Sequence, residues 1–126
     1  EASRVLKEES NMIDYALVQG NLGVAYRVLA EEGVTPETNL RQSVDILKGA
    51  LVILKEQSIW NQYVEFLIEL GRTHELSAGR GIPESAHEQA ARLAYEEAFT
   101  VAQQRNVRGD LLTAASTRLK ALEPVY

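Results

Sequence analysis

Residues 22–26 read LGVAY, and residues 70–74 read LGRTH. The two Leu-Gly pairs lie 48 positions apart, and residues around them repeat at the same shift. The repeated pairs include Tyr15 and Tyr63, Gly33 and Gly81, and Ala50 and Ala98. A fixed period of this size predicts stacked copies of one supersecondary unit, in which each copy contacts its neighbours.

Apolar residues are spaced as in helices throughout the chain. One predicted helix carries an apolar residue every three or four positions, at Leu40, Val44, Leu47, Leu51 and Leu54. We predict five helices, at roughly 11–31, 36–56, 59–78, 84–105 and 107–122. No strand pattern competes, so the predicted fold is all-α. Short links between long helices favour antiparallel neighbours.

Residues typical of helix ends also recur. Ser10, Ser58 and Asn106 share the 48-residue spacing, and we predict that they are N-caps, because their side-chain oxygens can accept a hydrogen bond from a free backbone N–H. A proline followed by an acid indicates two further helix starts, at Pro36-Glu37 and Pro83-Glu84. Glycines 33 and 81 are predicted to end the preceding helices, because glycine tolerates the left-handed conformation best.

These boundaries divide one domain, residues 1–126, into repeats. The predicted parts are the end of a preceding repeat helix (1–10), repeat 1 (11–57), repeat 2 (58–105) and a lone or capping helix (106–126). Residues 2–10 match residues 50–58 in five of nine positions. We therefore expect a piece excised from a longer protein; the alternative is a removed tag or leader before a natural N-terminal helix.

Composition excludes several classes of function. The net charge of −5 argues against a nucleic-acid partner and against a polybasic membrane-surface segment. The sequence has no cysteine, so a disulfide or a thiolate metal site is impossible. No apolar run approaches the roughly 18 residues of a membrane span. We expect a cytoplasmic protein without a metal or another cofactor.

The repeated residues resemble the tetratricopeptide family. Leu22-Gly23 and Leu70-Gly71 match its first helix, where a small residue lets the two helices of a hairpin approach closely. In the second helix, Ser43, Leu47 and Ala50 match its small-large-small pattern, as do Ala91, Tyr95 and Ala98. The resemblance implies an α-solenoid of stacked hairpins in a right-handed superhelix. The repeat unit of this chain has 48 residues, whereas the common unit of the family has roughly 34. The longer unit is similar to long repeats of large bacterial signalling and regulatory proteins.

In that family the first helix of each hairpin lines a concave groove. The resemblance places eleven partner-binding residues there: Asn21, Val24, Arg27, Glu65, Ile68, Glu69, Arg72, Glu75, Thr113, Thr117 and Lys120. They are spaced by three, four and seven positions within each helix, which puts them on one helix face. This mixed face suits an extended peptide or a partner helix. The alternative is a solvated helix face without a ligand.

Catalytic patterns find little support. Glu84 and His87 have the Glu-x-x-His spacing of di-iron helical bundles, but such a site needs a second copy, and the sequence has none. We therefore expect Glu84 to be an exposed acid, His87 to be a surface histidine and His74 to be a structural one. The chain is predicted not to be an enzyme.

The sequence thus favours a protein–protein interaction scaffold that binds a peptide or helix in its concave groove. A second hypothesis is self-association. The last helix lacks a second helix to cover it, and the first has lost its neighbour. Both ends should then expose apolar residues such as Leu112, Leu119 and Leu122, through which a homodimer could form.

Overall fold

The computed structural model describes residues 2–82 and 86–123, and every regular element in these ranges is a helix. The helices are α1 (Ala2–Glu31), α2 (Pro36–Glu56), α3 (Trp60–Gly79), α4 (His87–Gln104) and α5 (Gly109–Ala121). The prediction of an all-α chain with about five helices is confirmed. The predicted helix start at Pro83-Glu84 and residues 124–126 of the last helix lie outside the described residues.

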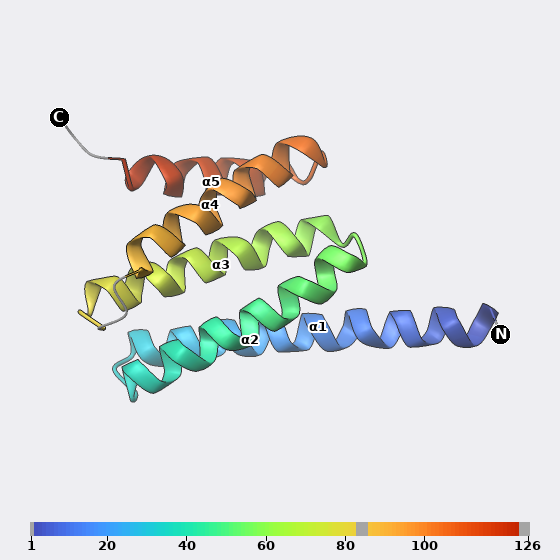
Figure 1. Ribbon diagram of the computed structural model, residues 1–126, viewed down its shortest axis with the longest axis horizontal. Coiled ribbons are helices and arrows are strands. Elements are labelled where there is room, and N and C mark those ends of the chain that lie inside the picture. The colour runs from blue at the N-terminus through green and yellow to red at the C-terminus, as the bar shows by residue number, and fades with distance from the viewer. Residues whose placement is uncertain (1, 83–85, 124–126) are drawn as a thin grey trace.

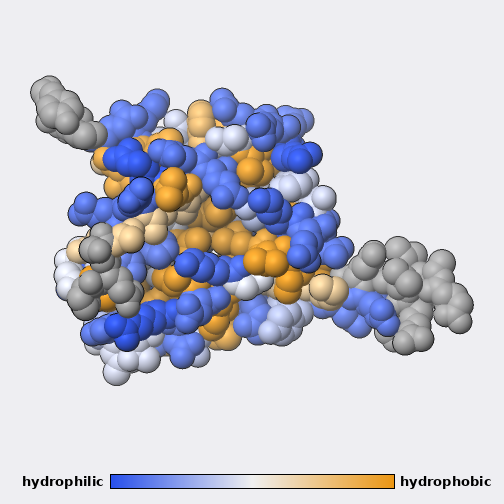
Figure 2. All heavy atoms as spheres, in the orientation of Figure 1, coloured by the Kyte–Doolittle hydropathy of each residue, from blue (hydrophilic) through white to orange (hydrophobic). Residues whose placement is uncertain are grey.

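Consecutive helices run antiparallel and form two hairpins that lie side by side (Figure 1). Helices α1 and α2 form the first hairpin, α3 and α4 form the second, and α5 lies against the second. Each helix contacts the helices before and after it in the chain, and α3 also contacts α1 and α5. The N-terminal part of α1 extends beyond the other helices (Figure 1). Hydrophobic residues gather in the seams between helices, whereas hydrophilic residues cover much of the outward surface (Figure 2).

Glycine allows close approach within each hairpin. A Cβ atom added to Gly23 would lie 2.8 Å from Cγ of Leu47 in α2. One added to Gly71 would lie within 2.8 Å of three ring atoms of Tyr95 in α4. Helical glycine costs up to about 1 kcal/mol relative to alanine, and these contacts explain why the cost is accepted at both positions. The prediction that both glycines have a packing role is confirmed.

Helix α1 differs from its predicted bounds. It runs without a break from Ala2 to Glu31, so the predicted start near residue 11 and the N-cap at Ser10 are wrong. No glycine or proline interrupts residues 2–19. Serine inside a helix costs only about 0.5 kcal/mol relative to alanine, less than is lost when the helix ends and restarts.

The other two predicted N-caps are also wrong, because they end helices instead. Ser58 and Asn106 have positive φ values of 57° and 52°, and each follows the last turn of a helix. The amide of Ile59, which follows Ser58, donates to the carbonyl of Leu54 at 2.9 Å, and the amide of Ser58 donates to Lys55 at 3.2 Å. This pair of bonds is the Schellman motif. The same motif follows α1 and α3, where Gly33 and Gly81 occupy the left-handed position, as predicted.

Replacing Ser58 by glycine should therefore stabilise the protein. The left-handed conformation costs a non-glycine residue about 1–2 kcal/mol, and the greater entropy of glycine in the unfolded chain offsets part of that gain. We expect Ser58→Gly to raise the free energy of unfolding by about 0.5–1 kcal/mol, measured by urea denaturation. Ser10→Gly is the matched control, because Ser10 lies 48 positions earlier but inside α1. That change should not stabilise the protein, and a gain there would contradict the explanation.

Candidate functional site

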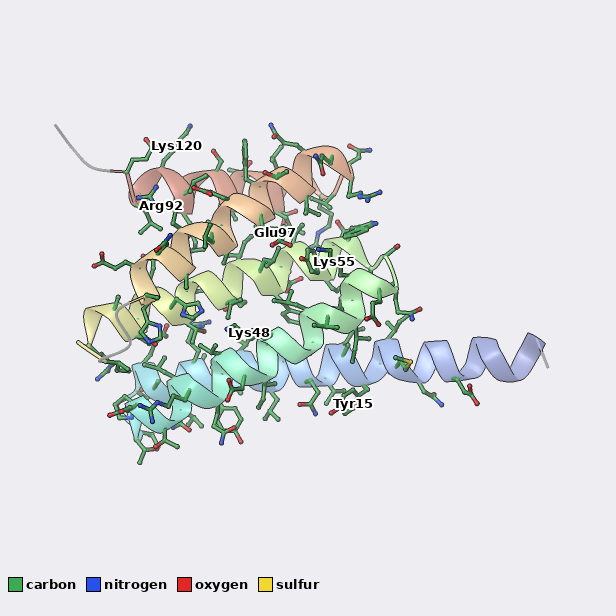
Figure 3. The ribbon with its side chains drawn as sticks, viewed as in Figure 1. Tyr15, Lys48, Lys55, Arg92, Glu97 and Lys120 are labelled. Carbon is green, nitrogen blue, oxygen red and sulfur yellow. The ribbon has the colours of Figure 1, made fainter. Side chains whose placement is uncertain are left out.

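The structure divides the eleven predicted groove residues by exposure. Arg27 and Ile68 are buried, with 4% and 6% of their surface exposed, so the expectation that these two face a partner is wrong. Half-buried positions are Val24, Glu69, Arg72 and Glu75, and exposed positions are Asn21, Glu65, Thr113, Thr117 and Lys120. Lys120 lies on α5 at the opposite end of the molecule from α1 (Figure 3). The predicted face is therefore partly a helix interface.

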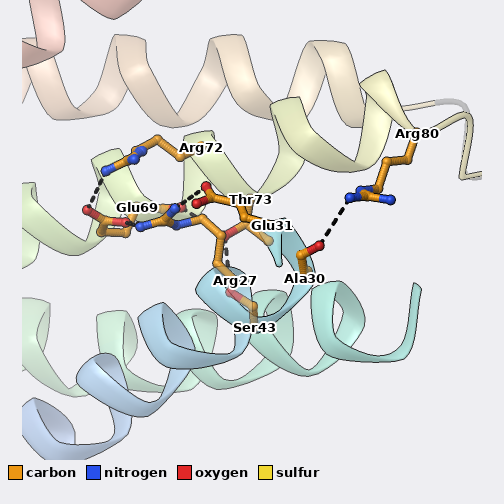
Figure 4. Close-up of polar contacts among 8 residues, drawn as sticks. All are labelled: Arg27, Ala30, Glu31, Ser43, Glu69, Arg72, Thr73 and Arg80. Carbon is orange, nitrogen blue, oxygen red and sulfur yellow. Dashed lines mark hydrogen bonds and ion pairs between the residues drawn. The ribbon is translucent and has the colours of Figure 1, made fainter. Parts of the chain in front are cut away.

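Three predicted groove residues come together, but they join α1 to α3. Both Nε and Nη2 of Arg27 reach Oε2 of Glu69, at 3.1 Å and 2.9 Å (Figure 4). Nη1 of Arg72 lies 3.3 Å from the other oxygen of Glu69. Arg27 also pairs with Glu31, one turn further along α1. The buried guanidinium is thus held by two carboxylates from different helices.

Neighbouring polar contacts continue this seam. The hydroxyl groups of Ser43 in α2 and Thr73 in α3 lie 3.0 Å apart, and Thr73 donates to the carbonyl of Glu69 at 2.9 Å. Arg80, just after α3, donates to the carbonyl of Ala30 in α1 at 3.1 Å (Figure 4). These contacts satisfy polar groups at the junction of the two hairpins, so their effect is to fix one hairpin against the next.

Two buried tyrosines link α3 and α4. The hydroxyl of Tyr63 donates to the carboxylate of Glu97, and that of Tyr95 donates to Glu75, one of the predicted groove residues. Burial, together with the adjacent carboxylate, raises the pKa of both tyrosines well above the ordinary value of 10.0. Glu75 therefore has a structural role in holding α4.

The raised pKa values predict a loss of stability in alkali. Above pH 10 the unfolded chain releases the Tyr63 and Tyr95 protons, whereas the folded chain keeps them. The stability that these groups contribute is complete below pH 10 and falls as the pH rises through the folded pKa. Urea denaturation at increasing pH should show this fall, and the Tyr63→Phe/Tyr95→Phe double variant should show a smaller one. An equal fall in both proteins would contradict the assignment.

A hollow of about 580 Å³ lies between α2, the end of α3 and the start of α4. His74 and His87 line it, with their Nδ1 atoms 2.9 Å apart, so one ring donates to the other. Both rings are buried, so His74 lies on a packed helix face as expected, whereas the expectation of a surface position for His87 is wrong. Glu84 of the Glu-x-x-His spacing lies outside the described residues. Among the described residues, no group of three or more His, Cys, Asp or Glu could hold a metal ion.

A second hollow, of about 740 Å³, lies where α3, α4 and α5 meet. Its walls include Glu75, Glu88 and Arg92. The Arg92 guanidinium donates to the carbonyl of Leu122 at 2.7 Å and so ties α4 to the end of α5. This hollow therefore carries charges of both signs.

A stripe of exposed apolar side chains runs along α1. The stripe consists of Tyr15, Val18, Leu22, Ala25 and Leu29, spaced alternately by three and four residues. Tyr15 and Val18 are 58% and 64% exposed, and Leu22 and Leu29 are about two-fifths exposed. Tyr15 projects from the side of α1 opposite α3 (Figure 3). Met12 and Val28 add exposed apolar surface on either side. Such spacing is typical of a helix seam that contacts another helix.

This stripe was not predicted from the sequence, which instead predicts exposed leucines on the last helix. Leu112, Leu119 and Leu122 are half-buried, because α5 folds back onto α4 and α3. Among the described helices, α1 therefore carries the exposed apolar stripe. The 48-residue shift carried the signal, since Tyr63, Phe66 and Leu70 occupy the corresponding positions of α3.

None of the described helices is long and apolar enough to cross a membrane. No protein-family model matches the sequence, and neither a curated protein nor a solved structure matches it.

Proposed function

We propose that this chain is a helical-repeat scaffold that binds another protein. The observation that carries the proposal is the stripe on α1, where large apolar side chains are exposed in register along about two heptads. Exposed apolar surface of this kind typically marks a protein contact site. A partner that covers the stripe would remove it from water.

The arrangement of the helices supports a tetratricopeptide-like α-solenoid. Helices contact their sequence neighbours, and the first helices of successive hairpins contact one another, as expected for a repeat array. The contacts of Gly23 and Gly71 supply the close hairpin packing that the resemblance implies. Cytoplasmic residence, in a larger bacterial signalling or regulatory protein, belongs to the same proposal and is compatible with the lack of cysteine.

Rigidity is the physical advantage of such a scaffold. The buried Arg27–Glu69 contact and the hydroxyl pair of Ser43 and Thr73 fix the hairpins before a partner arrives. A preorganised surface avoids most of the ordering cost that a flexible segment would incur on binding. The predicted groove and the α1 stripe are two surfaces on which this advantage could be used.

Peptide selection with the purified chain tests the proposal and separates the two surfaces. Peptides from a random library of helical and extended segments should be enriched, and variants should identify where they bind. Val18→Asp places a charge in the stripe, whereas Asn21→Arg and Thr113→Arg alter exposed groove positions. Loss of binding with the first variant assigns the stripe, and loss with the others assigns the groove. Failure to enrich any peptide would overturn the proposed function.

Self-association is the second candidate function, and the stripe favours it too. Helices with the same exposed seam can pair about a two-fold axis, which makes the interface self-complementary. Light scattering over a range of concentrations tests it. A dimer that Val18→Asp converts to a monomer would support self-association, and a monomer at every concentration would exclude it.

A further inference from the structure

We propose that the α1 stripe seats an amphipathic helix of a partner protein, in the place that α2 takes against α3. The partner helix runs antiparallel to α1, is apolar along its contact face and carries lysine or arginine at its edges. This inference rests on the proposed function, because it names the partner of the same scaffold.

The repeat supplies an internal comparison for the stripe. Its counterparts in α3, 48 positions later, are Tyr63, Phe66, Leu70, Thr73 and Ser77. All five are buried, with between 0% and 7% of their surface exposed. The same helix face is therefore covered in the second repeat and uncovered in the first.

The contacts of α3 show what covers this face. The hydroxyl of Thr73 meets that of Ser43 in α2, and the ring of Phe66 lies against Gly20 in α1. A Cβ atom at Gly20 would lie within 2.7 Å of three atoms of that ring. Much of the face thus points toward the preceding hairpin, and α2 is the helix that runs antiparallel along it (Figure 1). At the edge of the face, the Tyr63 hydroxyl instead donates to Glu97 in α4. No helix among the described residues covers the α1 stripe in this way.

The two ends of the array differ in a way that favours α1. In α5, Leu119 occupies the position of Gly71, where close approach of a second helix needs a residue without a Cβ. The structure describes no exposed large apolar side chain within Gly109–Ala121. Among the described residues, α5 therefore exposes little apolar surface, whereas α1 exposes a continuous apolar stripe.

The chemistry of the stripe defines the occupant further. Ala25 and Leu29 stand where α3 has Thr73 and Ser77, so these two stripe residues offer no hydroxyl. A serine such as Ser43 would lose its hydrogen-bond partner there, which makes a small apolar residue better suited to that position. Asp14 and Glu32 are exposed within four residues of the stripe, so the nearby charge is negative. Basic residues at the edges of the occupant complement it.

The α2 sequence itself gives a suitable probe. It carries Arg41, Lys48 and Lys55 at seven-residue intervals, which places them along one side of the helix. Lys48 and Lys55 are both seen on α2 in Figure 3. A stapled peptide of residues 35–57 with Ser43→Ala combines the apolar face, the small residue and the basic edge. The staple lowers the ordering cost of binding.

The lack of cysteine permits a direct test by thiol labelling. Val18→Cys puts a thiol in the centre of the stripe, and Val52→Cys puts one at an exposed apolar position of α2, which is 57% exposed. Peptide at about ten times its Kd should slow labelling at Val18→Cys by about tenfold and leave Val52→Cys unchanged. The peptide with serine retained should bind about fivefold more weakly or worse. Exchange of both lysines for glutamate should weaken binding further, and less so at high salt.

Equal labelling of Val18→Cys with and without the peptide would overturn the inference. Protection that appears without the peptide and rises with protein concentration would assign the stripe to a second copy of the chain, and would also overturn it. The proposed function fails separately. If library peptides bind the chain and Val18→Asp does not weaken their binding, the scaffold function is supported and the partner site on the α1 stripe is contradicted. If the library yields no binder, the scaffold function itself is contradicted.

Discussion

Gly71→Ala should produce one of the largest losses of stability in this protein. The added Cβ would lie within 2.8 Å of three atoms of the Tyr95 ring, which is fully buried. The ring cannot move aside freely, because its hydroxyl is bonded to Glu75. Overpacking of this kind costs about 3 kcal/mol, which exceeds the gain of about 1 kcal/mol from the better helix propensity of alanine. The net loss of about 2 kcal/mol should lower the midpoint of thermal unfolding by about 8 °C.

Gly49→Ala provides the matched control. Gly49 lies inside α2, and a Cβ there would meet nothing within 4 Å. That change should stabilise the protein by about 1 kcal/mol, because only helix propensity is altered. Combining Gly71→Ala with Tyr95→Val should cost less than the sum of the two single changes, since the smaller side chain makes room. Equal effects of Gly71→Ala and Gly49→Ala on the free energy of unfolding, together with additive effects of Gly71→Ala and Tyr95→Val, would contradict this explanation. They would show that the close approach of α3 and α4 is not the reason for glycine at position 71.

Arg27→Met should destabilise the protein by about 3 kcal/mol. The substitution retains the apolar stem but removes the charge that faces Glu69, and breaking one side of a buried pair costs about 3–5 kcal/mol. Arg72 remains beside Glu69 at 3.3 Å and offsets part of this loss. Urea denaturation measures the effect. An unchanged midpoint would mean that the contact between α1 and α3 contributes nothing to stability.

The control is an exposed ion pair of similar chemistry. Arg41 lies 2.9 Å from Glu37, and both side chains are more than half exposed. Arg41→Ala should change the free energy of unfolding by no more than about 0.5 kcal/mol. Arg27→Met combined with Glu69→Leu should be more stable than Arg27→Met alone, because no unpaired charge remains at the seam.

The repeat pattern predicted the five helices and the close approach at two glycines, but it assigned some helix ends wrongly. Gly23 and Gly71 indicated close packing from propensity alone, since a helical glycine needs a compensating contact. Ser58 and Asn106 misled, because both residue types favour the N-cap position, whereas here both occupy a left-handed helix end despite its cost to a residue other than glycine. The apolar residue that follows decides between them, as Ile59 does by closing the turn onto Leu54.

The site was less predictable, because it depends on contacts between distant residues. Arg27 lies within a helix, as predicted. Its burial depends on the packing of α3, where its partner Glu69 lies 42 residues away in the sequence. The α1 stripe has the same helical pattern as its counterpart in α3. Whether such a face is buried or exposed depends on the neighbouring helix, which the pattern within one helix does not contain.

The left-handed residue that follows each of four helices has a consequence for insertions and deletions of whole repeats. Gly33 and Gly81 close two helices, and Ser58 and Asn106 close two others, so each kind of junction recurs after one complete unit. Duplication or deletion of 48 residues within the reading frame would keep a left-handed residue after each of these helices. Unequal recombination would thus lengthen or shorten the chain by whole units while keeping the left-handed turn at these helix ends.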